Sequence, residues 1–308
     1  MSSKPKGKND HAWEKLFSKY DILNQIDMHG KFIISANQIK EFREPRLMAK
    51  FDHNINLPQI FSENRLAILP ISRGDYVISN FEAYKKFESI STKVIQASLP
   101  EHIQSLDKNN IQSEAISINC ALASGILNDF LGEENLVATV SGRMGSDRFD
   151  FDIKNSKSGR LASIEVINSQ IEIDAAYEGV ESLALLEAKR DISEDFLVRQ
   201  LYYPYRVWAE RVSKKIRPVF LVYSNGIFSL YEYEFKNPKI YNSLELVQQK
   251  NYILEDIEIT ISDLENLLMN TQIIREPEIP FPQADNFKRV INVCELLSST
   301  TMDRDEVT

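Results

Sequence analysis

Hydrophobic positions recur with a helical period over one long stretch of the chain. Between about Gln112 and Leu131 the apolar residues fall on one side of a helix, and Gly132 is placed to end it. A second helix is expected from Ser193 to about Lys214. Shorter alternating or apolar runs predict β-strands at 136–141, 148–153, 163–166, 170–176, 183–189, 218–223 and 228–235. The run at 218–223 is apolar throughout and predicts a central strand buried on both faces. Together these elements predict a mixed α/β fold.

The first ninety residues show a different order of elements. A helix is expected near Trp13–Leu23, followed by a strand at 31–35. Ser35 is a good N-cap for a further helix, which Pro45 would end or kink before another short helix begins at Pro45. Strands at 66–71 and 76–79 are joined by a Ser-Arg-Gly-Asp turn. Helix, strand, two helices and a hairpin is the order of a winged helix-turn-helix.

Four segments are therefore expected. They are a flexible tail at 1–10, a winged-helix-like DNA-binding domain at 11–95, a larger α/β domain at 96–275 and a C-terminal extension at 276–308 with a helix at 286–297. The chain has 308 residues, of which 43% are hydrophobic and 26% charged, as in globular proteins with a packed core. It contains no apolar run of membrane-spanning length, no secretory signal at its polar start and only two cysteines. We therefore expect a cytoplasmic protein without a membrane partner.

The net charge of −9 argues, taken alone, against a nucleic-acid partner. The charge is unevenly distributed, because the first ninety residues carry a small excess of Lys and Arg and the remainder is strongly acidic. An acidic protein can still present a basic surface to phosphates, so the net charge leaves DNA binding open.

Carboxylate–any–lysine triplets occur at 152–154, 187–189 and 234–236. Such triplets arise by chance, and only the one at 187–189 follows another acid-rich strand, 170–177. A hairpin turning around Gly179 would place Asp174 opposite Glu187 and Glu172 opposite Lys189, with all four side chains on one face of the sheet. The opposite face would then carry a set of apolar side chains: Ile171, Ile173, Leu186 and Ala188.

Three acids beside one lysine on the same face would be unfavourable unless a cation were bound, because the like charges of the acids repel one another. Asp174, Glu187 and the backbone carbonyl of Ala188 would form an oxygen-rich site suited to Mg²⁺. A lysine beside such a site, here Lys189, could orient or deprotonate a water molecule. This chemistry is that of phosphodiester hydrolysis.

Asp174 followed by Glu187-Ala188-Lys189 after a hairpin resembles the motif of the PD-(D/E)XK nucleases, and most of all the type II restriction endonucleases. Ile173 stands where the family has proline. Gln200 is similar to a glutamine that supports the site in some related nucleases, although Pro204 stands where their tyrosine would be. The resemblance covers about residues 112–235. It implies a restriction-endonuclease-like central sheet flanked by helices, Mg²⁺-dependent cleavage of double-stranded DNA, and a homodimer that cuts both strands. Glu172 and Gln200 would be supporting residues.

Four basic residues of the N-terminal segment recur at spacings of three, three and four and would line one side of a helix pair: Lys40, Arg43, Arg46 and Lys50. They are candidates for DNA contact. Asn37 and Gln38, near the helix start, are candidates for base readout because amides pair with adenine.

Other interpretations remain open at this point. Asp174, Glu187 and Lys189 could form a salt-bridge ladder on a solvated face. The protein could be a repair or recombination nuclease without sequence specificity, or a DNA-binding regulator with a structural nuclease-like domain. Asp52-His53-Asn54 faintly resembles a His-Asn-His nuclease, which needs a second histidine nearer than His102.

Overall fold

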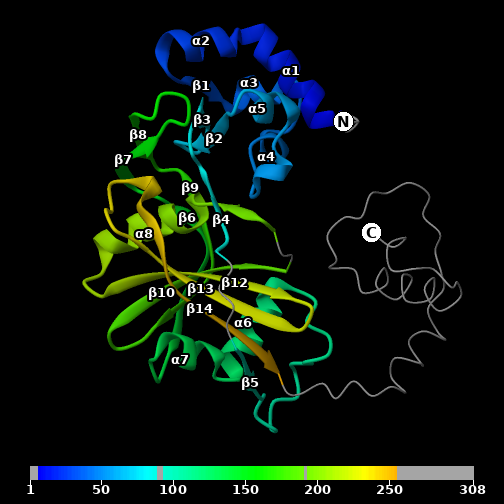
Figure 1. Ribbon diagram of the computed structural model, residues 1–308, viewed down its shortest axis with the longest axis vertical. Helices are drawn as coiled ribbons and strands as arrows, with labels where there is room; N and C mark the ends of the chain where they lie inside the picture. The colour runs from blue at the N-terminus through cyan, green and yellow to red at the C-terminus, as the bar shows by residue number, and fades with distance from the viewer. Residues whose placement is uncertain (1–5, 89–92, 191–192, 255–308) are drawn as a thin grey trace, which may run out of the picture.

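The computed structural model describes residues 6–88, 93–190 and 193–254, which form a small N-terminal unit beside a larger layered region (Figure 1). The expected C-terminal extension at 276–308, with its helix at 286–297, lies outside the described residues, as do the first five residues of the expected tail. Within the described ranges, no helix has the length and apolar character needed to cross a membrane.

The N-terminal unit, residues 8–79, combines short helices with a small antiparallel sheet of order β1-β3-β2. Its elements are α1 (Lys8–Tyr20), α2 (Ile22–His29), β1 (Phe32–Ser35), α3 (Ala36–Lys40), α4 (Pro45–Met48), η1 (Asn54–Asn56), α5 (Gln59–Glu63), β2 (Ala67–Pro70) and β3 (Asp75–Ser79). The expected strand at 31–35, the short helix from Pro45 and the hairpin of β2 and β3 are confirmed.

One expected helix is divided in two. Asp21 adopts a left-handed conformation with φ of 49°, which ends α1 at Tyr20 and starts α2 at Ile22. Trp13 of α1 is fully buried, and its indole Nε1 donates a hydrogen bond to the Met48 carbonyl at 2.9 Å. This bond ties the first helix to α4.

The larger region is built on a seven-stranded mixed sheet of order β5-β14-β13-β12-β10-β9-β6. The strands are β5 (Val94–Ala97), β6 (Val137–Gly145), β9 (Gln170–Glu178), β10 (Ser182–Lys189), β12 (Lys215–Ser224), β13 (Ile227–Phe235) and β14 (Leu244–Leu254). β10 runs parallel to β12 and β14 runs parallel to β5, whereas the other neighbours are antiparallel. The expected mixed α/β class is confirmed. β5 and β14 were not expected from the sequence.

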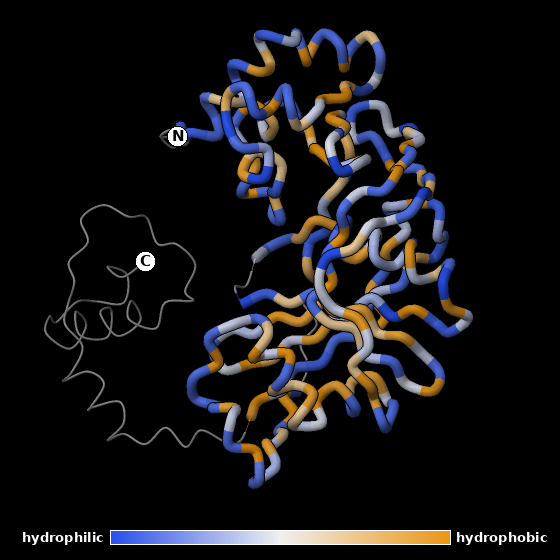
Figure 2. The backbone as a smooth tube through the Cα atoms, turned by 180° about the vertical axis from the view of Figure 1, so that it is seen from behind, coloured by the Kyte–Doolittle hydropathy of each residue, from blue (hydrophilic) through white to orange (hydrophobic). Residues whose placement is uncertain are grey.

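Helices cover both faces of the sheet. One face packs against α6 (Glu114–Ala123) and α7 (Ile126–Leu131), which replace the single helix expected at 112–131 because Gly125 has a φ of 75°. The other face packs against α8 (Arg199–Arg211) and the hairpin of β7 (Arg148–Lys154) and β8 (Leu161–Ile167). β12 is buried on both faces, as expected, and Figure 2 shows the hydrophobic segments gathered along these inner strands.

Backbone hydrogen bonds join the N-terminal unit, and the strand that follows it, to the larger region. β4 (Tyr84–Lys86) pairs antiparallel with β11 (Asp195–Leu197), just before α8. On the same strand, the Leu197 amide donates to the Asp52 carbonyl at 2.9 Å. Leu69 and Val77 of the N-terminal hairpin belong to the same hydrophobic core as α8. β4 lies before the expected domain boundary at 95 and β5 spans it, and both pair with strands of the larger region.

Candidate active site

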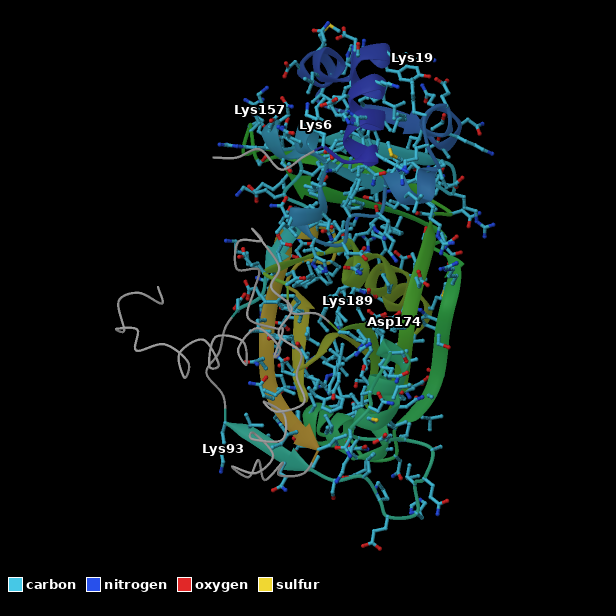
Figure 3. The ribbon with its side chains drawn as sticks, turned by 90° about the vertical axis from the view of Figure 1, so that its right-hand side faces the viewer. Lys6, Lys19, Lys93, Lys157, Asp174 and Lys189 are labelled. Atoms are coloured by element: carbon cyan, nitrogen blue, oxygen red, sulfur yellow. The ribbon has the colours of Figure 1, made fainter. Side chains whose placement is uncertain are left out.

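The acidic hairpin folds in the register expected from the sequence. β9 and β10 pair from Glu178 opposite Leu183 to Ala175 opposite Leu186, so the next residues in line are Asp174 and Glu187. The ladder stops there. Asp174 instead accepts a hydrogen bond from the Ala188 amide through Oδ2, at 2.8 Å. Figure 3 shows Asp174 and Lys189 near the middle of the molecule, at the end of the sheet that faces the N-terminal unit.

The expected division of apolar side chains between the two faces is wrong for β9. Leu186 and Ala188 pack toward α6 and α7, but Ile171 and Ile173 pack on the face that carries α8. The reason is a shift in the register between β9 and β6. Between the pairs Ala176–Val140 and Ile173–Gly142, β9 contains one more residue than β6 does. Such a bulge reverses the alternation of side chains beyond it.

Glu187 is the buried acid of the site, with a relative exposure of 7%. Its Oε1 accepts hydrogen bonds from Lys189 Nζ at 2.6 Å and from Gln200 Nε2 at 2.5 Å. The pKa of Glu187 is raised to about 7, chiefly by burial and also by the charges of Asp174 and Asp52, against the opposing charge of Lys189. The charged form of this carboxylate therefore gains stability from any additional cation.

Lys189 bridges two oxygens of the same strand. Its Nζ lies 2.6 Å from Glu187 Oε1 and 3.2 Å from the Ala188 carbonyl oxygen. Burial disfavours its charge, but the neighbouring carboxylate of Glu187 outweighs burial, so the pKa of Lys189 is raised. Lys189 is therefore an ammonium in this arrangement, held beside two of the three oxygens expected to bind a metal.

Gln200 is placed by the first turn of α8, immediately after β11. It is buried, and while Nε2 donates to Glu187, its Oε1 has no hydrogen-bond partner among the described residues. Pro204 lines the same cavity one turn further along the helix. The structure thus brings Gln200 to the acidic pair, and no tyrosine occupies the position of Pro204.

The acids, Lys189 and Gln200 line one cavity of about 110 Å³. Three further residues reach this cavity that sequence reasoning did not assign to it: Asp52, Glu114 and Arg199. Glu114 lies in the first turn of α6, and burial raises its pKa while the Lys189 charge opposes the shift. The sequence signal that could have placed Glu114 is Ser113, a good helix N-cap, whose Oγ accepts a hydrogen bond from the Ile116 amide and which makes Glu114 the first residue of the helix.

Asp52 reaches the cavity from the N-terminal unit. Its Oδ1 is buried and has no hydrogen-bond partner among the described residues, and Lys50 Nζ lies 3.9 Å from Oδ2. The neighbouring His53 and Asn54 both contact Asp195 of β11, through His53 Nδ1 to the carbonyl at 2.5 Å and through the Asn54 amide to Oδ1 at 2.9 Å. These contacts hold the segment on β11 and give His53 a structural role.

Glu172 does not face Lys189, so this expected pairing is wrong. Beyond the bulge in β9, Glu172 lies opposite Arg143 of β6, and Arg143 Nε donates to its Oε1 at 3.1 Å. Glu172 still borders the cavity, but as the partner of an arginine.

The residues proposed to contact DNA fall in different places. Arg46 and Lys50 are exposed and border a groove beside the cavity of Glu187, whereas Arg43 borders a separate cavity near α1. Asn37 and Lys40 are exposed on α3. The Gln38 side chain caps α3, since its Oε1 accepts a hydrogen bond from the Ser35 amide at 2.8 Å. The four cations therefore do not form a single line.

Among the residues that the structure describes, no group of three or more His, Cys, Asp and Glu side chains is arranged as a metal site. The site offers two carboxylates, of Asp174 and Glu187, and the Ala188 carbonyl. N–H and C=O groups of one strand residue point toward the same neighbouring strand, so the Ala188 carbonyl lies on the side of Asp174. Hard oxygen donors of this kind fit Mg²⁺, which retains several waters and needs few protein ligands.

Two family models match the chain. One, described as Domain of unknown function (DUF6997), matches residues 79–253, and the other, described as Domain of unknown function (DUF6996), matches residues 10–78. The two matches meet at the end of β3, where the N-terminal unit ends. No curated protein and no solved structure matches the chain.

Proposed function

The chain belongs to the DUF6997 family, whose function is unknown, and we propose that it is a Mg²⁺-dependent endonuclease with a restriction-endonuclease-like catalytic domain. The observation that carries the proposal is the convergence of Asp174 and Lys189 with the buried side chains of Glu187 and Gln200 at the end of β10. The substrate is double-stranded DNA, cut at specific sites by a homodimer in the cytoplasm. The N-terminal unit acts as a winged-helix-like DNA-binding module.

Asp174, Glu187 and the Ala188 carbonyl would hold the ion. When bound, Mg²⁺ supplies stabilisation of the negative charge that develops on phosphate oxygens and a lowered pKa for a water molecule. The raised pKa of Glu187 supports this assignment, because a buried carboxylate with a second acid beside it is stabilised in its charged form by a cation.

The chain's own side chains have distinct tasks in this proposal. Lys189 is an ammonium with three donors, so it orients the attacking water or a phosphate oxygen and does not remove a proton in the arrangement described. Gln200 fixes the rotamer of Glu187 by donating to Oε1. Asp174 fixes the backbone at Ala188 by accepting from its amide.

A salt-bridge ladder on a solvated face explains these contacts less well. The side chains of Lys189 and Glu187 are only 16% and 9% exposed. The triplet at 234–236 forms a comparable pair between Lys236 and Glu234, and there the side chains are 56% and 36% exposed. Burying an ion pair costs desolvation, which a solvated ladder avoids.

The test is digestion of defined plasmids with and without Mg²⁺, followed by sequencing of the cut ends. A type II enzyme should give unique ends at a recurring sequence. Ends without a common sequence would favour a repair or recombination nuclease. Absence of any Mg²⁺-dependent cutting of duplex DNA would contradict the proposal and favour a DNA-binding regulator.

A further inference from the structure

A second hollow lies beside the catalytic cavity, between α4 of the N-terminal unit and strands β6 and β9 of the large sheet. It has a volume of about 410 Å³ and shares Lys50, Glu172 and Arg199 with the lining of the catalytic cavity. The two hollows are therefore adjacent, and we call the second one the interdomain groove.

The interdomain groove is basic in a protein whose net charge is −9. Its cationic side chains come from four places, namely α4 and the residues after it, the β2–β3 turn, β6 and α8: Arg46, Lys50, Arg73, Arg143 and Arg199. Two acids, Glu44 and Glu172, border the same groove. The positive charge thus exceeds the negative charge within the groove.

Most of this positive charge has no acidic partner among the residues that the structure describes. Arg143 is paired with Glu172, and Lys50 lies 3.9 Å from Asp52. For Arg46, Arg73 and Arg199, no carboxylate of the described ranges lies within ion-pair distance. Guanidinium groups held in one groove without acidic partners favour binding of anions, and their planar geometry suits phosphate.

Arg199 lies where the groove meets the catalytic cavity. It is half-buried, its guanidinium carbon is 5.6 Å from the centre of the Tyr203 ring, and its buried Nε has no hydrogen-bond partner within the described part of the chain. It directly precedes Gln200, which contacts Glu187. A phosphate bound by Arg199 would therefore be next to the catalytic carboxylates.

We propose that the interdomain groove binds the phosphate backbone of one strand of duplex DNA and leads that strand into the catalytic cavity. Arg46 and Arg73 bind phosphates on the side of the N-terminal unit, and Arg199 binds the phosphate that adjoins the cavity. The inference rests on the proposed function for its substrate and adds the path of the strand. It also means that both units bind the same strand.

The test measures DNA binding apart from cleavage. Full-length Lys189→Ala protein serves as the background, with a labelled duplex and EDTA, and the affinity is measured by fluorescence anisotropy over a range of salt concentrations. Arg73→Ala and Arg199→Ala should each weaken binding by about tenfold, and each should reduce the slope of log affinity against log salt by about 0.9, the value for one lost phosphate contact. Arg199→Lys should retain most of the slope because it keeps the charge.

Lys215→Ala is the matched control. Lys215 is exposed at the start of β12, opposite Ser182, whereas Lys189 lies opposite Val222 at the other end of the same pair of strands. The control should leave affinity and slope unchanged. The proposal is overturned if the arginine variants, with unchanged thermal unfolding, bind like the background, or if Lys215→Ala weakens binding as much as they do.

The outcome is separable from that of the proposed function. Binding is measured without metal and without Lys189. If the protein binds DNA through the groove and the wild type never cuts DNA, the proposed nuclease function is contradicted and the proposed role of the groove is not. A protein that cuts DNA although both arginine variants bind normally would contradict the groove alone.

Discussion

Asp174 accepts a hydrogen bond from the amide of Ala188, with 2.8 Å between Oδ2 and the backbone nitrogen. This bond replaces the next rung of the ladder between β9 and β10. It directs a carboxylate onto the backbone of the strand that carries Glu187 and Lys189. The contact has two components, an acceptor for the amide and a negative charge, and substitutions can separate them.

Asp174→Asn should keep the acceptor and remove the charge. We expect it to unfold at nearly the wild-type temperature and to lose Mg²⁺-dependent cleavage. Asp174→Ala should lose cleavage as well, and its unpaired Ala188 amide should cost about 1–3 kcal/mol of stability. Thermal unfolding and plasmid cleavage on both variants check this. Cleavage by Asp174→Asn at the wild-type rate would show that the charge has no catalytic role.

Lys189→Ala should reduce cleavage by at least about 10²-fold, because it removes the group that orients the water. DNA binding should stay within a few-fold of wild type. Lys236→Ala is the matched control, since Lys236 also pairs with a carboxylate two residues earlier but is exposed. Asp152→Ala and Glu234→Ala should likewise retain activity. Equal rates for Lys189→Ala and Lys236→Ala would refute the site assignment.

Gln200→Ala should lower metal affinity or cleavage by about 10–100-fold, as is typical when a residue that orients a ligand is removed. The comparison is Gln249→Ala, because Gln249 is about equally buried and hydrogen-bonds to Asn251 on β14. Metal titrations of cleavage should show a change in metal dependence for Gln200→Ala alone. Equal effects of the two substitutions would mean that Gln200 acts only through stability.

A buried ion pair at the other end of the sheet gives a pH-dependent prediction. Arg217 donates from Nε and Nη2 to both oxygens of Glu232, at 2.8 and 2.6 Å. Burial alone would raise the pKa of Glu232, but the hydrogen bonds and charge of Arg217 outweigh it and lower the pKa below the ordinary value of 4.5. A lowered carboxylate pKa stabilises the folded state above the ordinary pKa, and this contribution disappears as the pH falls below it.

Glu232→Gln should therefore reduce the free energy of unfolding at neutral pH by up to about 3–5 kcal/mol, because the buried Arg217 loses its bidentate carboxylate and, among the described residues, retains only that of Glu133, 3.7 Å from Nη1. The difference from wild type should shrink as the pH falls below 4.5. Urea unfolding at several pH values measures both quantities. A difference that grows toward low pH would have the wrong sign for this explanation.

The sequence pattern was sufficient to predict the part of the site that lies on the hairpin of β9 and β10. Alternation and the turn around Gly179 were sufficient to predict the register of β9 and β10, and with it the approach of Asp174 to the strand of Glu187. The bulge in β9 was not predictable, because it depends on pairing with β6 about thirty residues away in the sequence. Because of this bulge, Glu172 accepts a hydrogen bond from Arg143 and does not face Lys189.

The position of Asp52 in the cavity could not be predicted from the residues around it in the sequence. It depends on backbone pairing between the residues after α4 and β11, which are separated by more than a hundred residues. β5 and β14 were missed for a related reason: β14 has mixed polarity, and its inner face is evident only once β13 lies beside it.

The shared core of the two units has a consequence for how such a protein could acquire new target preferences. Leu69 and Val77 pack in the same core as Phe149 and Tyr203 of the larger region, and the N-terminal segment brings Asp52 to the cavity that Glu187 lines. Exchanging residues 10–78 as a cassette would expose that core and remove a carboxylate from the cavity. Under the proposed function, we therefore expect a change of DNA target to come from single substitutions along the interdomain groove and on α3, and not from exchange of whole modules.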